Sequence, residues 1–412
     1  MPRLSGEGVP PVIQDTSTGS PVSTATSGTA TLYVCGITPY DATHLGHAAT
    51  YLAYDTLIRS WLDAGYNVEY VQNSTDVDDP LLERATARGI DWRELAASQT
   101  DLFRGDMQAL SIIPPDDYVA VTAVIPEVAA AVDALVRRGL AYEVPAADSI
   151  GGKPDLYFDS AAAADAGPWH LGLESNLGRE AMLELFGQRG GDPDREGKRD
   201  ALDPLLWRAA REGEPAWETV LGRGRPGWHI ECSVIALNRI GPTITVQGGG
   251  SDLLFPHHEF SAAHASALTG EPFARIYSHA GMVAYQGEKM SKSLGNLVLV
   301  SQLLAGGADA RAIRLALLAH HYRTDWEWTA DSLPEAEARL ASWRAWAEPV
   351  AALDAQGSGD DAIVGIIRSA ITRDLGTPEA LAAVDAAVAA DAPPSAAAID
   401  AVHALLGIDL RS

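Results

Sequence analysis

The sequence predicts an α/β fold in which a parallel sheet is flanked by helices, with an inserted connective segment and an α-helical C-terminal domain. Strand-like and helix-like stretches alternate at residues 31–73 and again at 242–268. This alternation is typical of βαβ units, whose strands are parallel. Between the two regions the alternation is lost, and beyond residue 309 the chain is Ala-rich with a helical pattern.

Composition indicates a globular protein of two or three domains. The chain has 412 residues, of which 47% are hydrophobic, so it can bury a sizeable core. No stretch approaches the roughly 18 apolar residues that cross a bilayer, and the N-terminus lacks the basic-then-apolar pattern of a secretory signal. We therefore expect a cytoplasmic protein with no membrane partner.

Charge and cysteine content narrow the function classes. The net charge is −25, from 30 basic against 55 acidic residues. This balance opposes nucleic acid as a partner, because phosphate binding uses Lys and Arg. The two cysteines are too few for a disulfide framework, and in a reducing compartment such residues are more often buried, metal-binding or reactive.

The first βαβ unit follows an irregular lead-in, residues 1–30, which is rich in Ser, Thr, Gly and Pro. The β-branched and aromatic runs TLYVCG (31–36) and NVEYVQN (67–73) predict two strands. The stretch between them has apolar residues at helical spacing and ends at Gly65. Ligands of such a unit bind at the carboxyl ends of its strands.

The middle of the chain interrupts the α/β pattern. Residues 91–140 favour helices, and short strands with Gly-rich turns follow to about residue 200, which predicts an insertion. Strand-like PTITVQ then restarts the strand-then-helix order. The predicted parts are the lead-in at 1–30, the first half of the α/β domain at 31–115, the inserted connective segment at 116–205, the second half at 206–300, and a helical stem and C-terminal domain at 301–412.

Two short motifs are suited to phosphate chemistry. His44 and His47 in HLGH open a helix after a strand, where free N–H groups and the helix dipole attract anions. On these residues alone, surface or packing roles are about as well supported. Lys289 and Lys292 lie in GEKMSKSLGN, where two ammonium groups could stabilise a departing pyrophosphate. Taken alone, a solvated basic turn explains that loop better.

Cys35, Cys232 and one of His257 or His258 form a soft donor set suited to zinc. Three protein ligands would leave the open fourth position of a catalytic site. The wide spacing gives weak support, and two buried thiols with a capping histidine explain the residues about as well.

Acidic and Gly-rich stretches follow the predicted strands. Asp76, Asp78 and Asp79 could bind an amine or Mg²⁺, but acids at the N-terminus of a helix are the commoner arrangement. The glycines of QGGGSD (247–252) would let backbone approach a nucleotide, or form a tight turn.

In combination, the motifs resemble class I aminoacyl-tRNA synthetases and, within them, cysteinyl-tRNA synthetases. YVCGITPYDATHLGHA is similar to that family's YVCGPTVYD…HIGHAR, KMSKS is unaltered, and NSTDVDD, RPGWHIECS and GGGSDLLFPHHE also match. The likeness covers about residues 31–330. It implies a Rossmann-like catalytic domain that binds ATP with Mg²⁺, and one zinc ion held by Cys35, Cys232 and His257.

Several departures point to a paralogous branch, the mycothiol ligases. Where the synthetases have a glutamate ligand, a histidine before the triple glycine and a lysine after the paired aspartates, this chain has Ser261, Gln247 and Pro80. QRGGDP (188–193) is close to the ERGGDP of that branch, with Gln188 in place of its glutamate. The C-terminal region is acidic, and a domain that grips an anticodon is usually basic.

The resemblance implies a ligase that uses ATP to activate L-cysteine as cysteinyl-adenylate and joins it to the amine of glucosaminyl-inositol, releasing AMP and pyrophosphate, and we expect a monomer. His44, His47, Lys289 and Lys292 would act in catalysis. The resemblance places these residues around the adenylate: Cys35, Gly36, Ile37, Thr38, Thr50, Asn73, Ser74, Thr75, Trp228, Gly250, Ser251, Asp252 and Val283. A cysteinyl-tRNA synthetase with an unusual C-terminal region and a catalytically dead paralogue with a binding role are the alternatives.

Overall fold

The centre of the molecule is a five-stranded parallel sheet. The structure is a computed structural model that describes residues 1–41, 43–290, 295–351 and 362–411. The strand order is β12-β11-β3-β4-β5, and every neighbouring pair is parallel. The strands are β3 (Ala30–Val34), β4 (Val68–Ser74), β5 (Asp117–Ala120), β11 (Ile244–Gly250) and β12 (Ala274–Ala280). The predicted α/β class with a parallel sheet is confirmed.

The two faces of the sheet pack against different cores. Along β3, Leu32 and Val34 join the core that contains the first long helix, whereas Tyr33 and Cys35 join the opposite core. This alternation follows from the two-residue period of a strand. The helices around the sheet are α1 (Leu45–Asp63), α2 (Asp79–Arg88), α3 (Trp92–Ala109), α4 (Ile125–Arg137), α7 (Trp228–Arg239) and α8 (Glu259–Thr269).

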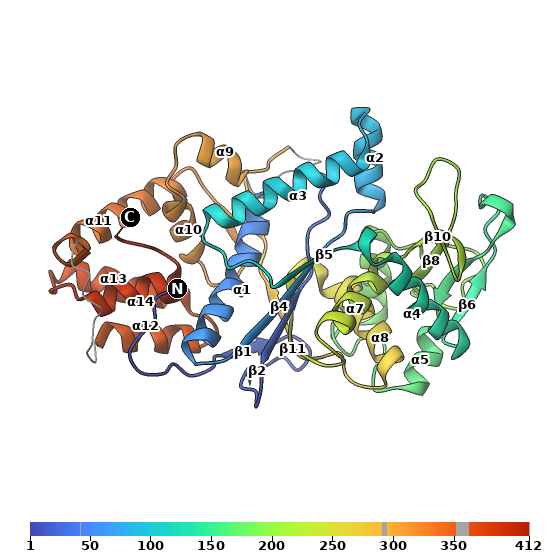
Figure 1. Ribbon diagram of the computed structural model, residues 1–412, viewed down its shortest axis with the longest axis horizontal. Helices are drawn as coiled ribbons and strands as arrows, with labels where there is room; N and C mark the ends of the chain where they lie inside the picture. The colour runs from blue at the N-terminus through green and yellow to red at the C-terminus, as the bar shows by residue number, and fades with distance from the viewer. Residues whose placement is uncertain (42, 291–294, 352–361, 412) are drawn as a thin grey trace.

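The inserted segment forms a second sheet beside the first (Figure 1). This second sheet is antiparallel, with the strand order β6-β7-β8-β10-β9. Its elements are β6 (Ala141–Val144), β7 (Asp155–Phe158), α5 (Ser160–Ala166), α6 (Arg179–Gln188), β8 (Leu205–Ala209), β9 (Trp217–Thr219) and β10 (Gly222–Pro226). It begins and ends later than the predicted range of 116–205. β5 belongs to the parallel sheet but is too short to show a strand period, and β10 lies in the stretch GRGRP, which resembles a loop.

The N-terminal residues are more ordered than their composition predicts. A hairpin of β1 (Val12–Asp15) and β2 (Ser20–Ser23) lies within the predicted irregular lead-in. Ile13 is fully buried in the core, and the Asp15 carboxylate accepts a hydrogen bond of 2.9 Å from the backbone N–H of Tyr277 in β12. These contacts are with residues far along the chain, so local composition could not reveal them.

The C-terminal part is helical, as predicted, and packs on α1 (Figure 1). It contains α9 (Val300–Ala305), α10 (Ala310–Leu318), α11 (Ser332–Ala351), α12 (Ala362–Thr372), α13 (Thr377–Ala389) and α14 (Ala396–Leu406). A small sheet joins strands from before and within this region: β13 (Val283–Tyr285) and β14 (Glu288–Lys289) come before α9, and β15 (Trp326–Trp328) lies between α10 and α11. Within the described ranges, no helix has the length and apolarity required to span a membrane.

Candidate active site

A cavity of about 560 Å³ lies at the carboxyl ends of β3 and β11, next to the first turn of α1. This position is where ligands bind in open parallel sheets. Many of the residues predicted to surround an adenylate or to act in catalysis line it: Cys35, Gly36, Ile37, Thr38, His44, His47, Thr50, Trp228, Gly250 and Asp252. Sequence reasoning missed other lining residues, some of which lie inside the quoted motifs but were assigned no role: Tyr40, Gly46, Tyr51, Leu253, Gly281, Met282, Met290 and Leu297.

The two motif histidines lie at the start of α1. His44 is its N-cap residue, and its Nδ1 accepts a hydrogen bond of 3.1 Å from the backbone N–H of Gly46. The His44 and His47 rings are stacked, with centroids 3.9 Å apart. Both therefore face the cavity beside the positive end of the helix dipole, an arrangement that suits a phosphate chain.

Backbone pairing brings the segment after the lysine motif to the same place. The N–H of Leu45 donates to the carbonyl of Val298 at 3.0 Å, and the N–H of Val300 donates to the carbonyl of Thr43 at 3.2 Å. Met290 and Leu297, one on each side of residues 291–294, both line the cavity. Lys292 and the side chain of Lys289 lie outside the described residues.

The remaining predicted residues have different positions. Asn73 supports the cavity wall from behind, because its Oδ1 accepts a hydrogen bond of 2.8 Å from the N–H of Gly36. A Cβ at Gly36 would lie 1.6 Å from the carbonyl oxygen of Asn73, so only glycine fits there. The N–H of Thr75 donates to the carbonyl of Ile37 at 3.0 Å.

Three other predicted contacts are not part of this lining. Ser74 lines a separate cavity of about 380 Å³ instead. Val283 is buried in the core, and Ser251 follows Gly250 in a short turn. Their motifs are adjacent to lining residues in sequence, but alternate side chains of a strand or turn point in different directions.

Cys35, Cys232 and His257 form a buried group whose ligand atoms all lie within 4.8 Å of one another. The two sulfur atoms are 3.8 Å apart, and Nε2 of His257 is 3.2 Å from Sγ of Cys232. Cys35 follows β3, Cys232 lies on α7, and His257 lies in the turn before α8. Two thiols and one imidazole are the donors that zinc prefers, so the residues present fit this ion.

The charge state of the group also favours a cation. Burial would raise the pKa of Cys232, but hydrogen bonding to Cys35 and the charge of His257 lower it well below its usual value. Burial and the hydrogen bond to Cys232 raise the pKa of Cys35 well above its usual value. Of the two thiols, Cys232 thus loses its proton more readily, and a thiolate there would be stabilised by a nearby positive partner.

Two neighbours orient this group, and sequence reasoning did not assign them a role. His229 Nδ1 lies 3.1 Å from His257 Nδ1 and leaves Nε2 of His257 directed at the sulfur. Hydrogen bonding of the second ring nitrogen is how metal-binding imidazoles are usually held. Gln247 donates through Nε2 to Sγ of Cys35 at 3.3 Å.

The structure separates His258 and Ser261 from the metal group. Nδ1 of His258 is 2.8 Å from Nε2 of His279, on the other side of the turn. The hydroxyl of Ser261 donates to the carbonyl of His229 at 3.2 Å. Of the described residues, the group that could hold a metal contains one histidine, His257.

The acidic cluster has the structural role that is commoner for such residues. Asp78 is the N-cap residue of α2 and accepts a hydrogen bond from the N–H of Asp79 at 2.8 Å. Asp76 accepts a hydrogen bond of 2.9 Å from the N–H of Thr122. Burial raises the pKa of Asp78 to about 6, so this carboxylate takes up a proton more readily than an exposed one.

The chain is similar to known proteins along its whole length. The family described as tRNA synthetases class I (C) catalytic domain matches residues 21–338. The L-cysteine:1D-myo-inositol 2-amino-2-deoxy-alpha-D-glucopyranoside ligase of Clavibacter michiganensis subsp. michiganensis (strain NCPPB 382) is 61% identical over 100% of this chain and 97% of that protein. The ligase of the same name from Clavibacter sepedonicus is 62% identical over 97% of this chain and 99% of that protein.

Solved structures agree on the fold. The crystal structure of Mycobacterium tuberculosis methionyl-tRNA synthetase bound by methionyl-adenylate matches with a TM-score of 0.62 and 16% identity, over 92% of this chain and 88% of that chain. The chain belongs to the class I tRNA synthetase family and, within it, to the family of L-cysteine:1D-myo-inositol 2-amino-2-deoxy-alpha-D-glucopyranoside ligases.

Proposed function

We propose that this protein is an ATP-dependent ligase of mycothiol biosynthesis that activates L-cysteine and joins it to the amine of glucosaminyl-inositol. One observation carries the proposal. Cys35 belongs both to the Cys-Cys-His group and to the lining of the cavity at the start of α1. A sulfur-selective site and a phosphate-binding site are therefore joined at one residue, as activation of cysteine requires.

In the first step, the carboxylate oxygen of cysteine attacks the α-phosphorus of ATP, and pyrophosphate leaves with its magnesium ion. The N-terminus of α1 with His44 and His47 binds the phosphates, and Lys289 and Lys292 stabilise the charge that develops on the leaving group. Cys35, Cys232 and His257 would hold zinc, which when bound supplies a soft Lewis acid for the substrate sulfur. Trp228, stacked on His257 with ring centroids 4.3 Å apart, covers this site.

In the second step, the neutral amine of glucosaminyl-inositol attacks the carbonyl carbon of cysteinyl-adenylate. The C–N bond forms, the C–O bond to phosphate breaks, AMP leaves with the bonding electrons, and the proton of the amine passes to a base or to water. The product is an amide.

Charge on the C-terminal region supports the amino sugar over tRNA as acceptor. Beyond residue 346 the basic residues other than histidine are Arg368, Arg373 and Arg411. Arg368 pairs with Asp63 at 2.7 Å and Arg411 pairs with Asp400 at 2.6 Å. Arginines already engaged with carboxylates on an acidic surface are poorly suited to grip phosphates.

Supplying purified protein with ATP, cysteine and either acceptor tests the proposal. We expect cysteine to be joined to glucosaminyl-inositol and not to tRNA carrying a cysteine anticodon. Cysteine should drive ATP–pyrophosphate exchange strongly, and serine should drive it negligibly. Transfer to tRNA alone would identify a cysteinyl-tRNA synthetase, and absence of exchange with either amino acid would identify a paralogue without catalysis.

A further inference from the structure

A second cavity, of about 670 Å³, adjoins the proposed adenylate cavity. The two cavities share Thr38, Tyr40, Trp228, Asp252 and Leu253 in their linings. Its volume lies within the range of roughly 300–1,000 Å³ that small-molecule sites occupy. A molecule held there would therefore lie next to whatever fills the first cavity.

The lining of this second cavity is polar and mixed in charge. One side carries Asp78, Asp79 and Glu83 from the start of α2. Next to them the lining carries Arg208 and Arg225 from the inserted sheet. Guanidinium groups donate hydrogen bonds to hydroxyl oxygens, and carboxylates accept them from hydroxyl and ammonium groups. A polyhydroxylated amine could therefore interact with both the carboxylates and the guanidinium groups.

Arg208 and Arg225 are not available for a polyphosphate. Arg208 makes two hydrogen bonds of 2.9 Å to Glu214, and Arg225 lies 3.3 Å from Glu214 and also pairs with Asp79. Their charges are thus balanced within the protein. An RNA end would meet carboxylates on α2, whereas a protonated amine would be attracted by them.

A turn of the inserted segment also lines the cavity. Gln188, Arg189 and Gly191 line it at the end of α6. A Cβ at Gly191 would lie 2.5 Å from the Phe186 ring, so glycine is required for the turn to lie against that ring. Arg189 donates to the carbonyl of Asp252 and to that of Phe255, and so ties the turn to the loop between β11 and α8.

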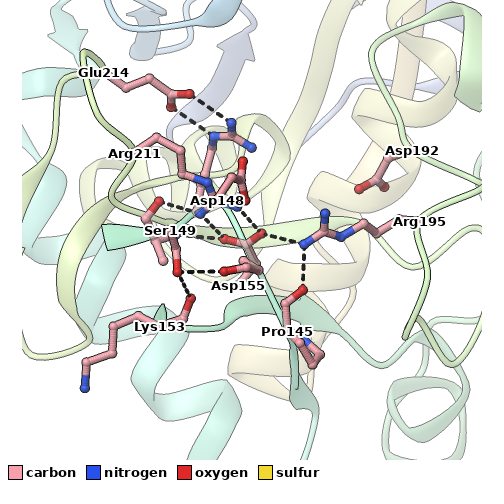
Figure 2. Close-up of polar contacts among 12 residues, drawn as sticks. Pro145, Asp148, Ser149, Lys153, Asp155, Asp192, Arg195, Arg211 and Glu214 are labelled. Carbon is pink, nitrogen blue, oxygen red and sulfur yellow. Dashed lines mark hydrogen bonds and ion pairs between the residues drawn. The ribbon is translucent and has the colours of Figure 1, made fainter. Parts of the chain in front are cut away.

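Ion pairs of the inserted segment lie beside this turn. Arg211 makes hydrogen bonds of 2.7 and 2.8 Å to the buried carboxylate of Asp155, which also accepts from Arg195 at 3.3 Å. Figure 2 shows both arginines directed at Asp155, with Arg195 also donating to the carbonyl of Pro145 at 2.8 Å and Asp192 alongside. Lys198 binds Asp192 at 2.9 Å. Asp192 lines the cavity, so its pairing with Lys198 fixes this part of the wall.

We infer that this second cavity is the acceptor site, in which the carboxylates of α2 draw in the protonated amine of the amino sugar and the turn at 188–192 contacts its hydroxyl groups. The inference rests on the proposed function and adds the location of the acceptor. The shared wall would present the amine, once deprotonated, to the carbonyl of the adenylate.

Glu83→Gln tests the carboxylates of α2, and Gln188→Ala tests the turn at 188–192. Both residues are exposed on the lining, and neither lines the proposed adenylate cavity. We expect the KM for glucosaminyl-inositol to rise about tenfold in Glu83→Gln, as for loss of a hydrogen bond to a charged group, and severalfold in Gln188→Ala. Cysteine-dependent ATP–pyrophosphate exchange, measured without acceptor, should be unchanged in both. Glu94→Gln on α3 and Glu180→Gln on α6, both exposed and outside the cavity, are the matched controls.

A neutral analogue separates charge from shape. With a hydroxyl in place of the amine, the analogue should inhibit the parent protein and Glu83→Gln equally, because the lost carboxylate acts on the ammonium. An acceptor KM within twofold of the parent value in both variants would overturn the inference. Loss of exchange in the parent protein would instead contradict the proposed function.

Discussion

At the residue scale, the proposed metal group consists of three side chains from distant parts of the chain. Cys35 and Cys232 are 197 positions apart, yet their sulfur atoms are 3.8 Å apart because β3 and α7 pack in the same core. His257 completes the group, with its Nε2 3.2 Å from Sγ of Cys232. Ser261, at the position of a glutamate ligand in the resembling synthetases, uses its hydroxyl on the carbonyl of His229 instead. If these three donors hold zinc, its fourth position would be open to the sulfur of the proposed substrate.

Cys232→Ser should lower the zinc content of the purified protein and its cysteine-dependent exchange together, because a neutral hydroxyl is a much poorer zinc ligand than a thiolate. Ser261→Ala is the control, since it removes a buried neighbour that is not in the donor set. Metal analysis of both proteins checks the prediction. Full zinc content in Cys232→Ser, or its loss in Ser261→Ala, would show that the ligand set is different.

His229→Phe should weaken zinc binding by roughly 10–100-fold, the usual effect of losing the group that holds a metal-binding imidazole. His229 is buried, and burial followed by the charges of His257 and His264 lowers its pKa well below its usual value. This favours the neutral ring, whose Nδ1 can accept a hydrogen bond from the Nδ1–H of His257. Zinc titration with a chelator at neutral pH measures the effect, and unchanged affinity would limit His229 to packing.

At the scale of elements, the start of α1 and the segment around residues 297–300 form one unit. Their backbones pair through Leu45 with Val298 and Thr43 with Val300. Asn296, largely buried, donates to the carbonyl of Tyr285 at 3.1 Å and so joins the far end of the lysine motif to β13. The motif is thus tied at its base to the same helix N-terminus that would bind the phosphates.

Lys292→Ala should slow cysteine-dependent exchange by about 10²–10³-fold, the usual loss when one group that stabilises transition-state charge is removed. Cysteine binding should change little, because the proposed sulfur-binding group contains no lysine. Lys153→Ala is the control, since Lys153 is an exposed lysine of the inserted segment that points away from the ion-pair network in Figure 2. Equal losses in exchange rate and in cysteine affinity would contradict a role for Lys292 in the leaving group.

The sequence predicted those parts of the site and fold that local patterns or motifs determine. HLGH, the first βαβ unit and the C-terminal helices have such signals. β5, the N-terminal hairpin and the hydrogen bond from Arg189 to the carbonyl of Asp252 have no such local signal. Each is stabilised by partners far along the chain. His229 is next to Trp228 in a matching motif, but only packing of α7 against the turn before α8 shows which of the two orients His257.

On the scale of the whole molecule, a buried charge cluster joins the catalytic sheet to the C-terminal helices. The carboxylate of Asp55 on α1 pairs with Arg59 at 2.7 Å and with Arg314 on α10. Arg314 donates to the carbonyl of Leu406 at 2.6 Å, and Arg59 donates to that of Ala404 at 3.1 Å. The last described helix, α14, therefore meets the same cluster as α1, whose first turn lines the proposed adenylate cavity.

Asp55→Asn should lower the free energy of unfolding by about 3–5 kcal/mol, because it leaves two buried guanidinium groups without their anion. Burial would raise the pKa of Asp55, but Arg314 and Arg59 lower it below its usual value. The stabilisation is thus complete above roughly pH 4, the ordinary unfolded value, and is lost as the pH falls through the lowered folded value. Asp133→Asn, which breaks the exposed pair with Arg137, should cost less than about 1 kcal/mol. Denaturant titrations at neutral and acidic pH compare the two variants. Equal losses in the free energy of unfolding would mean that the cluster does not join the catalytic sheet to the C-terminal helices.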